Sequence, residues 1–347
     1  MELAVVLDFL APSPIEVKSA LLSKFSPLQP GVMKQNWRSN KKFGYDSPST
    51  PEFWDLYQKA DFRCSICSSQ YRISVDHINQ DNKDHRLENL QILCTPCNVS
   101  KATGGVKNPD AQYVIMSEFM TYIEEYGEVP TTRQLAKHIK SKHEFENRPL
   151  SGYLHLYHFL VFRSNNPLQS ENVEDCISST QQVIDVLQIS HDEAIRTIIS
   201  ACSPPSHYST RANWKNSKRY GNDAPEGKVF LELLRDALYR CEDCGNVSQL
   251  SFDHIDSNPT NHTKENLQVL CFTCNRKRSK KGIKFANKKA QIFDFMVEHF
   301  LNHGTIPSVG RVVKIFPGHR DNGLGGEYYF YAYMKKRLSD IESGKFR

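Results

Sequence analysis

Two cysteine frames organise this chain. The first reads Cys64-Ser-Ile-Cys67, then 26 residues, then Cys94-Thr-Pro-Cys97; the second reads Cys241-Glu-Asp-Cys244, then the same 26 residues, then Cys271-Phe-Thr-Cys274. Four thiolates in two Cys-x-x-Cys knuckles match a closed tetrahedral site, so we expect one structural Zn²⁺ per frame. Surface or redox-active cysteines are the alternative, which the repeated spacing disfavours. A closed site offers no position to a substrate, and both zinc ions are expected to stabilise the fold.

The two frames belong to a tandem duplication. Matching residues are separated by a constant 177 positions, as in Trp37 and Trp214 or His77 and His254, with no gap between them. A repeat of this length indicates a duplicated domain, because solenoid units repeat every ~20–50 residues. The boundary is predicted near 166–178, where Pro-, Ser- and Gln-containing segments occur. We therefore predict a first domain at 1–170 and a second at 171–347.

Each half has the same predicted order of elements. The capping boxes Ser13-x-x-Glu16 and Ser190-x-x-Glu193 open a helix, and a second helix is expected near 51–60 and 226–238. A Gly-x-x-Pro break divides each helical tail, which is either a helix-turn-helix or a helical hairpin covering the core. Fingers and tails are predicted at about 62–103 and 110–163 in the first half and at about 239–280 and 287–342 in the second.

A second pattern lies between the knuckles. In the first half, alternating apolar residues place Asp76-His77 at the end of a strand, Leu90–Leu93 form its hairpin partner, and Asn98 opens a helix. The second half repeats this pattern at Asp253-His254, Leu267–Leu270 and Asn275. Both halves therefore predict a small ββα finger inside a largely helical chain, an α+β fold class.

This pattern resembles the HNH endonuclease family and its zinc-bearing ββα-metal fingers. The shared motif is Cys-x-x-Cys…Asp-His-Ile…Glu-Asn-Leu…Leu-Cys-x-x-Cys-Asn, over about 40 residues of each half. The resemblance implies two tandem, zinc-stabilised HNH fingers embedded in helical segments. It also implies metal-dependent hydrolysis of phosphodiester bonds that leaves 5′-phosphate and 3′-hydroxyl ends.

The resemblance implies roles for particular residues. His77 and His254 would be general bases, since imidazole accepts a proton near neutral pH. Asn89 and Asn266 would hold the loop that aims the histidine. One Mg²⁺ or Mn²⁺ per finger would bind to carboxylate and amide oxygens, which such hard ions prefer. The expected ligands of these ions are Asp76 and Asn98 in the first finger, and Asp253 and Asn275 in the second.

Two other classes of protein carry similar cysteine frames. A treble-clef-like zinc module that only binds DNA or protein has no need of Asp-His and both asparagines together, although one copy could be a silent partner. A zinc deaminase is set aside for two reasons. Its His-x-Glu signature requires a glutamate two positions after the histidine, which His77 and His254 lack, and no Pro precedes a knuckle.

Basic residues around the fingers predict contacts with DNA phosphates. Between residues 271 and 290 there are eight basic residues and no acidic one, a run that would add salt-dependent affinity. A solvated helix face is the alternative. The first half has fewer basic residues at this place, so we expect the second to hold DNA more tightly. The predicted DNA-binding residues are Arg276, Lys277, Arg278, Lys280, Lys281, Lys284, Lys101, Lys41, Lys42, Lys218 and Arg219.

Rings beside these cations leave two interpretations open. Trp37 and Trp214 either stack on nucleic-acid bases or pack on the zinc finger. His85 and His262 occupy equivalent loop positions, where a surface role is favoured over a place beside the phosphate.

Composition is consistent with a soluble globular protein. The 347 residues are 39% hydrophobic and 24% charged, enough for two ordinary cores. The net charge of +5 does not by itself identify a nucleic-acid binder. No apolar run approaches the ~20 residues that cross a bilayer, and the apolar start carries Glu2 and Asp8 without a basic region. We expect an intracellular protein, cytoplasmic or nucleoid-associated, that is neither secreted nor membrane-bound.

The sequence thus predicts a single-chain pseudo-dimeric HNH endonuclease that acts as a monomer on duplex or branched DNA. Two linked sites would let one chain cut both strands. Family analogy favours a homing or other mobile-element enzyme, or a restriction enzyme. A branched-DNA resolvase and a non-catalytic zinc-dependent DNA-binding protein are the alternatives.

Overall fold

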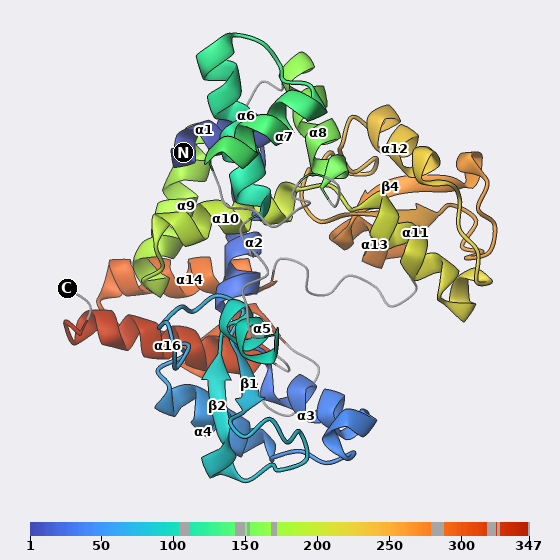
Figure 1. The fold of residues 1–347 in the computed structure, drawn as a ribbon. Coiled ribbons are helices and arrows are strands. Elements are labelled where there is room, and N and C mark those ends of the chain that lie inside the picture. Colours follow the sequence, from blue (N-terminus) through green and yellow to red (C-terminus); the bar gives the residue numbers. More distant parts are fainter. Residues whose placement is uncertain are drawn as a thin grey trace. The chain divides into compact units, whose positions relative to one another are not determined.

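The structure is a computed structural model that describes residues 1–103, 111–142, 150, 153–167, 172–278, 288–317, 324 and 327–345. These residues are mostly helical, with two small β-hairpins that each lie near a four-cysteine cluster (Figure 1). The predicted α+β class is confirmed at this level. The predicted residues Lys280, Lys281 and Lys284 lie outside the described residues.

The described elements follow the same order in both halves, so that each hairpin comes after four α-helices and before a short helix and a helical tail. The first half contains α1 (Leu3–Leu10), α2 (Pro14–Phe25), α3 (Pro30–Arg38), η1 (Lys41–Phe43), α4 (Thr50–Lys59), β1 (Ser74–His77), η2 (Leu87–Asn89), β2 (Leu90–Leu93), α5 (Thr95–Thr103), α6 (Ala111–Tyr126), α7 (Thr132–Lys142) and α8 (Leu154–Asn165). The second half contains α9 (Val173–Leu187), α10 (His191–Cys202), α11 (His207–Lys215), η3 (Lys218–Tyr220), α12 (Gly227–Asp236), β3 (Leu250–His254), η4 (Lys264–Asn266), β4 (Leu267–Cys271), α13 (Phe272–Arg278), α14 (Lys288–His303), α15 (Val309–Ile315) and α16 (Tyr328–Glu342).

Capping residues fix where several helices begin. The backbone N–H of Ser13 donates to Glu16 Oε2 at 2.8 Å, and that of Ser190 donates to Glu193 Oε2 at 3.1 Å. The second predicted capping box is complete, because the Glu193 backbone N–H donates to Ser190 Oγ at 3.2 Å. At the first, Ser13 Oγ donates to Glu16 Oε2 at 2.9 Å, so only the carboxylate half of the predicted box forms. Ser49 and Glu52 form a further capping box at the start of α4.

Each hairpin is a two-stranded antiparallel sheet. His77 on β1 pairs with Leu90 on β2, and His254 on β3 pairs with Leu267 on β4. The predicted strands and partners are therefore confirmed. Burial alternates along both first strands, which places the histidine on the buried face and the preceding aspartate on the other face.

Backbone conformations repeat at the same constant spacing as the sequence. Left-handed φ values occur at Phe62 (56°) and Tyr239 (54°), before the first cysteine of each frame. Ser68 in the first knuckle and Gly245 in the second also share a left-handed backbone, at 59° and 74°. Such conformations are uncommon outside glycine, so their repetition indicates that the duplication extends to local structure.

The described contacts group the chain into two compact units that combine segments of both halves. The second finger and the first tail belong to one unit, and the first finger and the second tail to the other. The first unit comprises Met1–Val17, Asp110–Thr180 and Ala194–Ala286, and the second comprises Lys18–Pro109, Gln181–Glu193 and Asn287–Arg347.

In the second unit, helix α16 covers the first finger. The ring of Tyr333 meets that of Phe62 edge-on with 4.9 Å between centroids, and both side chains are buried. Lys336 pairs with Asp61 Oδ1 at 2.6 Å, and Arg337 donates to the backbone carbonyl of Asp61 at 2.9 Å. The core below the first zinc frame is therefore completed by a helix from the other half.

In the first unit, helix α8 takes the matching position on the second finger. The ring of Tyr239, which corresponds to Phe62, lies 5.1 Å from the ring of Phe159 and 5.0 Å from that of Phe162. Tyr239 is 1% exposed. The domains predicted at 1–170 and 171–347 remain a prediction about the sequence repeat, because each compact unit draws its finger and its tail from different halves.

Candidate active site

The four cysteines of each frame come together as predicted. Their sulfur atoms all lie within 4.8 Å of one another in both clusters. Cys67 Sγ is 3.5 Å from Cys94 Sγ, and Cys244 Sγ is 3.7 Å from Cys271 Sγ. A Zn–S bond of ~2.3 Å in a tetrahedron requires sulfurs ~3.8 Å apart, so both clusters are consistent with a structural zinc site.

Backbone N–H groups already favour thiolate in these clusters. Burial would raise the pKa of Cys64, but hydrogen bonds from the backbone of Cys94, Cys67 and Ile66 outweigh it and lower that pKa to about 7. Burial raises the pKa of Cys97 to about 11. One thiolate per frame is thus readily formed, and a bound cation would be needed to hold all four.

The general base predicted in the first finger is held in an aromatic stack. The ring of Trp37 stacks on those of Phe43 and His77, with centroid distances of 4.6 Å and 5.0 Å, and the centroids of Phe43 and His77 are 6.1 Å apart. Phe53 meets Trp37 edge-on at 5.1 Å. Trp37 therefore packs on the finger, as one of the two sequence interpretations proposed, and it covers one face of the imidazole.

A second histidine determines which nitrogen of His77 carries the lone pair. His85 Nε2 lies 3.0 Å from the carbonyl oxygen of Phe43, which can only accept, so this nitrogen donates. In its neutral form, His85 then accepts at Nδ1, which lies 3.1 Å from His77 Nε2. His77 therefore donates through Nε2 and keeps its basic lone pair at Nδ1.

The second finger repeats this arrangement almost atom for atom. Trp214 lies 4.7 Å from Tyr220 and 4.9 Å from His254. His254 Nε2 is 3.1 Å from His262 Nδ1, and His262 Nε2 is 3.1 Å from the carbonyl oxygen of Tyr220. The same reasoning leaves the lone pair of His254 at Nδ1.

Both candidate bases are enclosed. His77 is 2% exposed and His254 is 7% exposed. Burial, followed by the neighbouring His85, lowers the pKa of His77 in spite of the nearby Asp76, and burial with His262 does the same for His254. Each imidazole is therefore neutral at neutral pH, the form that can accept a proton.

The middle asparagine of each motif fixes the loop that carries the second histidine. Asn89 Nδ2 donates to the Asp84 carbonyl oxygen at 2.8 Å, and its Oδ1 accepts from the Asn79 backbone N–H at 3.0 Å. Asn266 makes the matching bonds to the Asn261 carbonyl oxygen at 2.8 Å and the Asp256 N–H at 3.1 Å. These contacts suit the loop-holding role that the family resemblance implies for Asn89 and Asn266.

In the second finger, Asn275 on α13 contacts the strand face that carries Asp253. Asn275 Nδ2 donates to Ser251 Oγ at 3.0 Å, and Ser251 lies two residues before Asp253 on the same side of β3. Asn275 contacts Ser251 through its amide nitrogen, so its amide oxygen is the atom that would bind an ion. A carboxylate and an amide oxygen on one face fit the donor set of Mg²⁺ or Mn²⁺.

In the first finger, a lysine lies on the corresponding carboxylate. Lys101 Nζ is 2.6 Å from Asp76 Oδ2 and also donates to the backbone carbonyl of His77. Asn98 lies one turn before Lys101 on α5, so both residues share the helix face that meets Asp76. An ammonium group thus already contacts the carboxylate of Asp76, one of the two predicted ligands of the first finger.

Most of the other predicted DNA-binding residues that the structure describes are exposed. They lie beside the aromatic stacks of both fingers and on the helix that follows the last knuckle of the second finger. Those beside the stacks are Lys41 and Lys42 on η1 and Lys218 and Arg219 on η3, and those on α13 are Arg276, Lys277 and Arg278. Only Lys101, which is half-buried against Asp76, departs from the predicted solvent-facing position.

The sequence singled out His85 and His262 but favoured a surface role for them. The structure instead places each ring against the candidate base, and this sequence-based interpretation is wrong for both. Their identical loop positions in the two halves could have indicated this role, because the rest of the motif offers no residue that would orient the general base.

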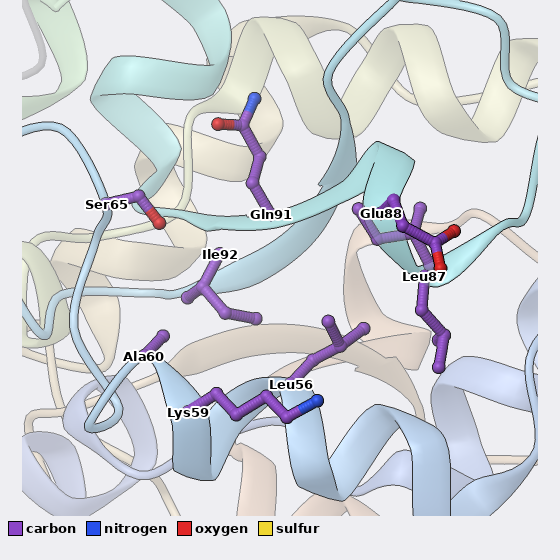
Figure 2. A pocket seen from close by; sticks show the side chains of 9 residues that line it. Leu56, Lys59, Ala60, Ser65, Leu87, Glu88, Gln91 and Ile92 are labelled. Carbon is purple, nitrogen blue, oxygen red and sulfur yellow. The ribbon is translucent and has the colours of Figure 1, made fainter.

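The described pocket near the first finger is a separate feature. Figure 2 shows it between helix α4, which contributes Leu56 and Lys59, and strand β2, which contributes Gln91 and Ile92. His77 and Asn98 do not line it. The candidate active site is therefore defined by its chemical groups and does not coincide with this cavity.

Comparison with known protein families identifies one of the two fingers as an HNH domain. Residues 241–281 match the HNH endonuclease family, and this match covers the second finger from its first cysteine to the basic helix. The family match recognises one copy only, although both halves contain a four-cysteine cluster. No curated protein and no solved structure matches the chain. The chain thus contains one recognised HNH endonuclease domain, which suggests phosphodiester hydrolysis and a nucleic-acid substrate.

Among the described residues, none of the helices combines the length and apolar character that a bilayer crossing requires.

Proposed function

We propose that this protein is a metal-dependent DNA endonuclease whose principal catalytic centre is the second finger. One observation carries this proposal: His254 is oriented by His262 within a finger that matches the HNH endonuclease family and in which Asn275 bonds to Ser251, two residues before Asp253 on β3. Orientation of a neutral imidazole beside a hard-ion donor set is the requirement for hydrolysing a phosphodiester.

The residues of the second finger would divide the reaction between them. His254 would accept the proton of the attacking water at Nδ1, because its Nε2 is committed to His262. His262 would hold the ring in that tautomer through the Tyr220 carbonyl oxygen. A divalent ion held by Asp253 and Asn275 would supply charge neutralisation at the phosphate and at the leaving oxygen.

Charged surfaces next to the site favour a nucleic acid as the substrate. Lys277 on α13 and Arg219 on η3 are exposed, and both elements flank the residues that hold His254. Cations at such positions add affinity for phosphates without reading sequence. The choice of homing, restriction or resolvase activity stays open in this proposal, as does cleavage of both strands by one chain.

A non-catalytic zinc-dependent DNA-binding protein is the competing function. It would keep the zinc frames and the basic helix, but it would not require the His254–His262 pair. The oriented base therefore favours the nuclease over the binding module.

The test is cleavage of supercoiled plasmid with Mg²⁺ by the full chain and by the variants His77→Ala, His254→Ala and the double variant. We expect nicking by the wild type that ends when the ion is chelated, and a loss of about 10²–10⁴-fold with His254→Ala, the range of a general base. Plasmid binding with no cleavage by the zinc-loaded wild type would instead establish the binding module.

The first finger is examined in the same assay. Efficient linearisation by the wild type, with nicking alone by each single variant, would support cleavage at two sites. An unchanged rate with His77→Ala would assign the first finger a structural role.

A further inference from the structure

We propose that the first finger carries a built-in cation, the Lys101 ammonium, at the place where the second finger binds a divalent ion. The chain would then have one strong divalent-ion site, at Asp253 and Asn275, instead of two. This inference rests on the proposed function for the assignment of the second site.

The ammonium group of Lys101 contacts two oxygen atoms of the first finger. Lys101 Nζ lies 2.6 Å from Asp76 Oδ2, and the same ammonium group donates to the His77 carbonyl oxygen. The side chains of Lys101 and Asp76 are only 20% and 18% exposed. An ion pair that is partly removed from water is screened less than a surface pair, so the ammonium competes strongly for this carboxylate.

The basic residue at the matched position of the second finger has a different partner. Arg278 occupies on α13 the place that Lys101 has on α5, yet it pairs with Asp243 Oδ1 at 2.9 Å. Asp243 lies in the second zinc knuckle, and the corresponding residue of the first knuckle is the exposed Ile66. An apolar side chain cannot hold a cation, which explains why the basic residue turns to the aspartate in the first finger alone.

Within the described part of the chain, the two carboxylates share a matching glutamine partner. Gln91 donates to Asp76 Oδ2 at 3.1 Å, and Gln268 donates to Asp253 Oδ2 at 3.2 Å. Among the residues that the structure describes, the difference between the fingers at this carboxylate is therefore the basic side chain. Because Mg²⁺ and Mn²⁺ bind to proteins through one or two carboxylates, a lysine on the carboxylate removes most of the site's attraction for them.

The test counts Mn²⁺ ions bound to the full, zinc-loaded chain by electron paramagnetic resonance. We expect one strongly bound Mn²⁺ in the wild type, none in Asp253→Asn, and one in Asp76→Asn. Replacement of the lysine, in Lys101→Met, should create a second site with at least about tenfold higher affinity than the wild-type first finger, as expected when a contacting charge of like sign is removed. That second site should disappear in the Lys101→Met/Asp76→Asn variant.

The matched control is Arg278→Met, which removes a basic side chain at the same helix position in the second finger. It should leave a single Mn²⁺ site, because Arg278 is paired with Asp243. Zinc content verifies that every variant is folded.

Two equally strong Mn²⁺ sites in the wild type would overturn the inference, as would a folded Lys101→Met chain that still binds one ion. The wild-type and aspartate variants decide the matter even if Lys101→Met fails to fold. A chain with the expected Mn²⁺ pattern but no cleavage would leave this inference standing and remove the proposed nuclease function.

Discussion

The two fingers have the same structural framework and differ in the partner of one basic side chain. Both hold four cysteines, a His–His pair and a stacked tryptophan in nearly the same geometry. In the second finger Arg278 is drawn to the zinc knuckle by Asp243, while in the first finger Lys101 lies on Asp76. A duplicated fold can therefore retain its structural contacts while two substitutions alter the chemistry available at one copy.

The largest effect should follow from breaking one zinc frame. Cys94→Ala and Cys271→Ala should each remove one zinc ion and unfold one finger, because structural zinc supplies ~10–16 kcal/mol in small finger peptides. Zinc content and DNA cleavage are measured together. We expect Cys271→Ala to abolish cleavage and Cys94→Ala to affect it less, and two retained zinc ions in either variant would contradict the assignment of the cysteines.

Separation of the two halves should have the next largest effect. A fragment of residues 171–347 lacks α8, whose Phe159 and Phe162 cover Tyr239. Removal of buried aromatic contacts costs ~3–5 kcal/mol per residue, so the fragment should not fold as a monomer. It should instead dimerise through its own tail or recover its fold when mixed with residues 1–170.

Light scattering and circular dichroism of each fragment, alone and mixed, measure this dependence. A zinc-loaded monomer of 171–347 with the thermal stability of the full chain would show that the fingers do not need the tail from the other half.

Removal of the orienting histidine should have a smaller, catalytic effect. His262→Ala should lower kcat by about 10–100-fold, the usual cost of losing a group that orients a reactive residue. KM and Mn²⁺ binding should stay the same, since His262 contacts His254 and the Tyr220 carbonyl oxygen. His262→Asn should recover part of the rate, because its amide oxygen can accept from His254 Nε2.

The matched variant His85→Ala sharpens the comparison between the fingers. Equal losses of kcat in both variants would mean that the first finger contributes to cleavage as much as the second.

The smallest effect should come from single surface cations. Lys277→Gln should reduce the slope of log affinity against log salt by about 1, the value for one lost phosphate contact. Lys228→Gln is the control, because Lys228 pairs with Glu226 at 3.2 Å on the start of α12. Equal slopes for wild type and Lys277→Gln would exclude α13 from the DNA contact.

Local features of the fold followed from the sequence because they depend on short spacings. The cysteine frames placed the knuckles, and alternation placed Asp76 and His77 at the end of β1. The capping boxes at Ser13 and Ser190 gave the starts of two helices. Each of these patterns is satisfied by neighbours within one element or one hairpin.

Features that depend on contacts between distant segments could not be predicted from the sequence. Tyr239 and Phe159 are 80 positions apart in the sequence, and nothing in either helix pattern indicates that they pack together. The position of Lys101 depends on whether residue 66 can hold a cation. The sequence assigned Lys101 to DNA because it lies on the helix after the metal motif, where basic residues would meet phosphates. The sequence also shows Ile66 in place of Asp243, but the contact between Lys101 and Asp76 depends on the folded position of α5 against β1.

The rate of the first phosphodiester cut with Mg²⁺, measured under single-turnover conditions for the wild type, Asp253→Asn and the surface control Asp236→Asn, tests the central claim most directly. Since a catalytic cation supplies several kcal/mol, the account predicts a loss of at least about a hundredfold for Asp253→Asn and a wild-type rate for the control. A wild-type rate for zinc-loaded Asp253→Asn would contradict the assignment of the catalytic centre to the second finger.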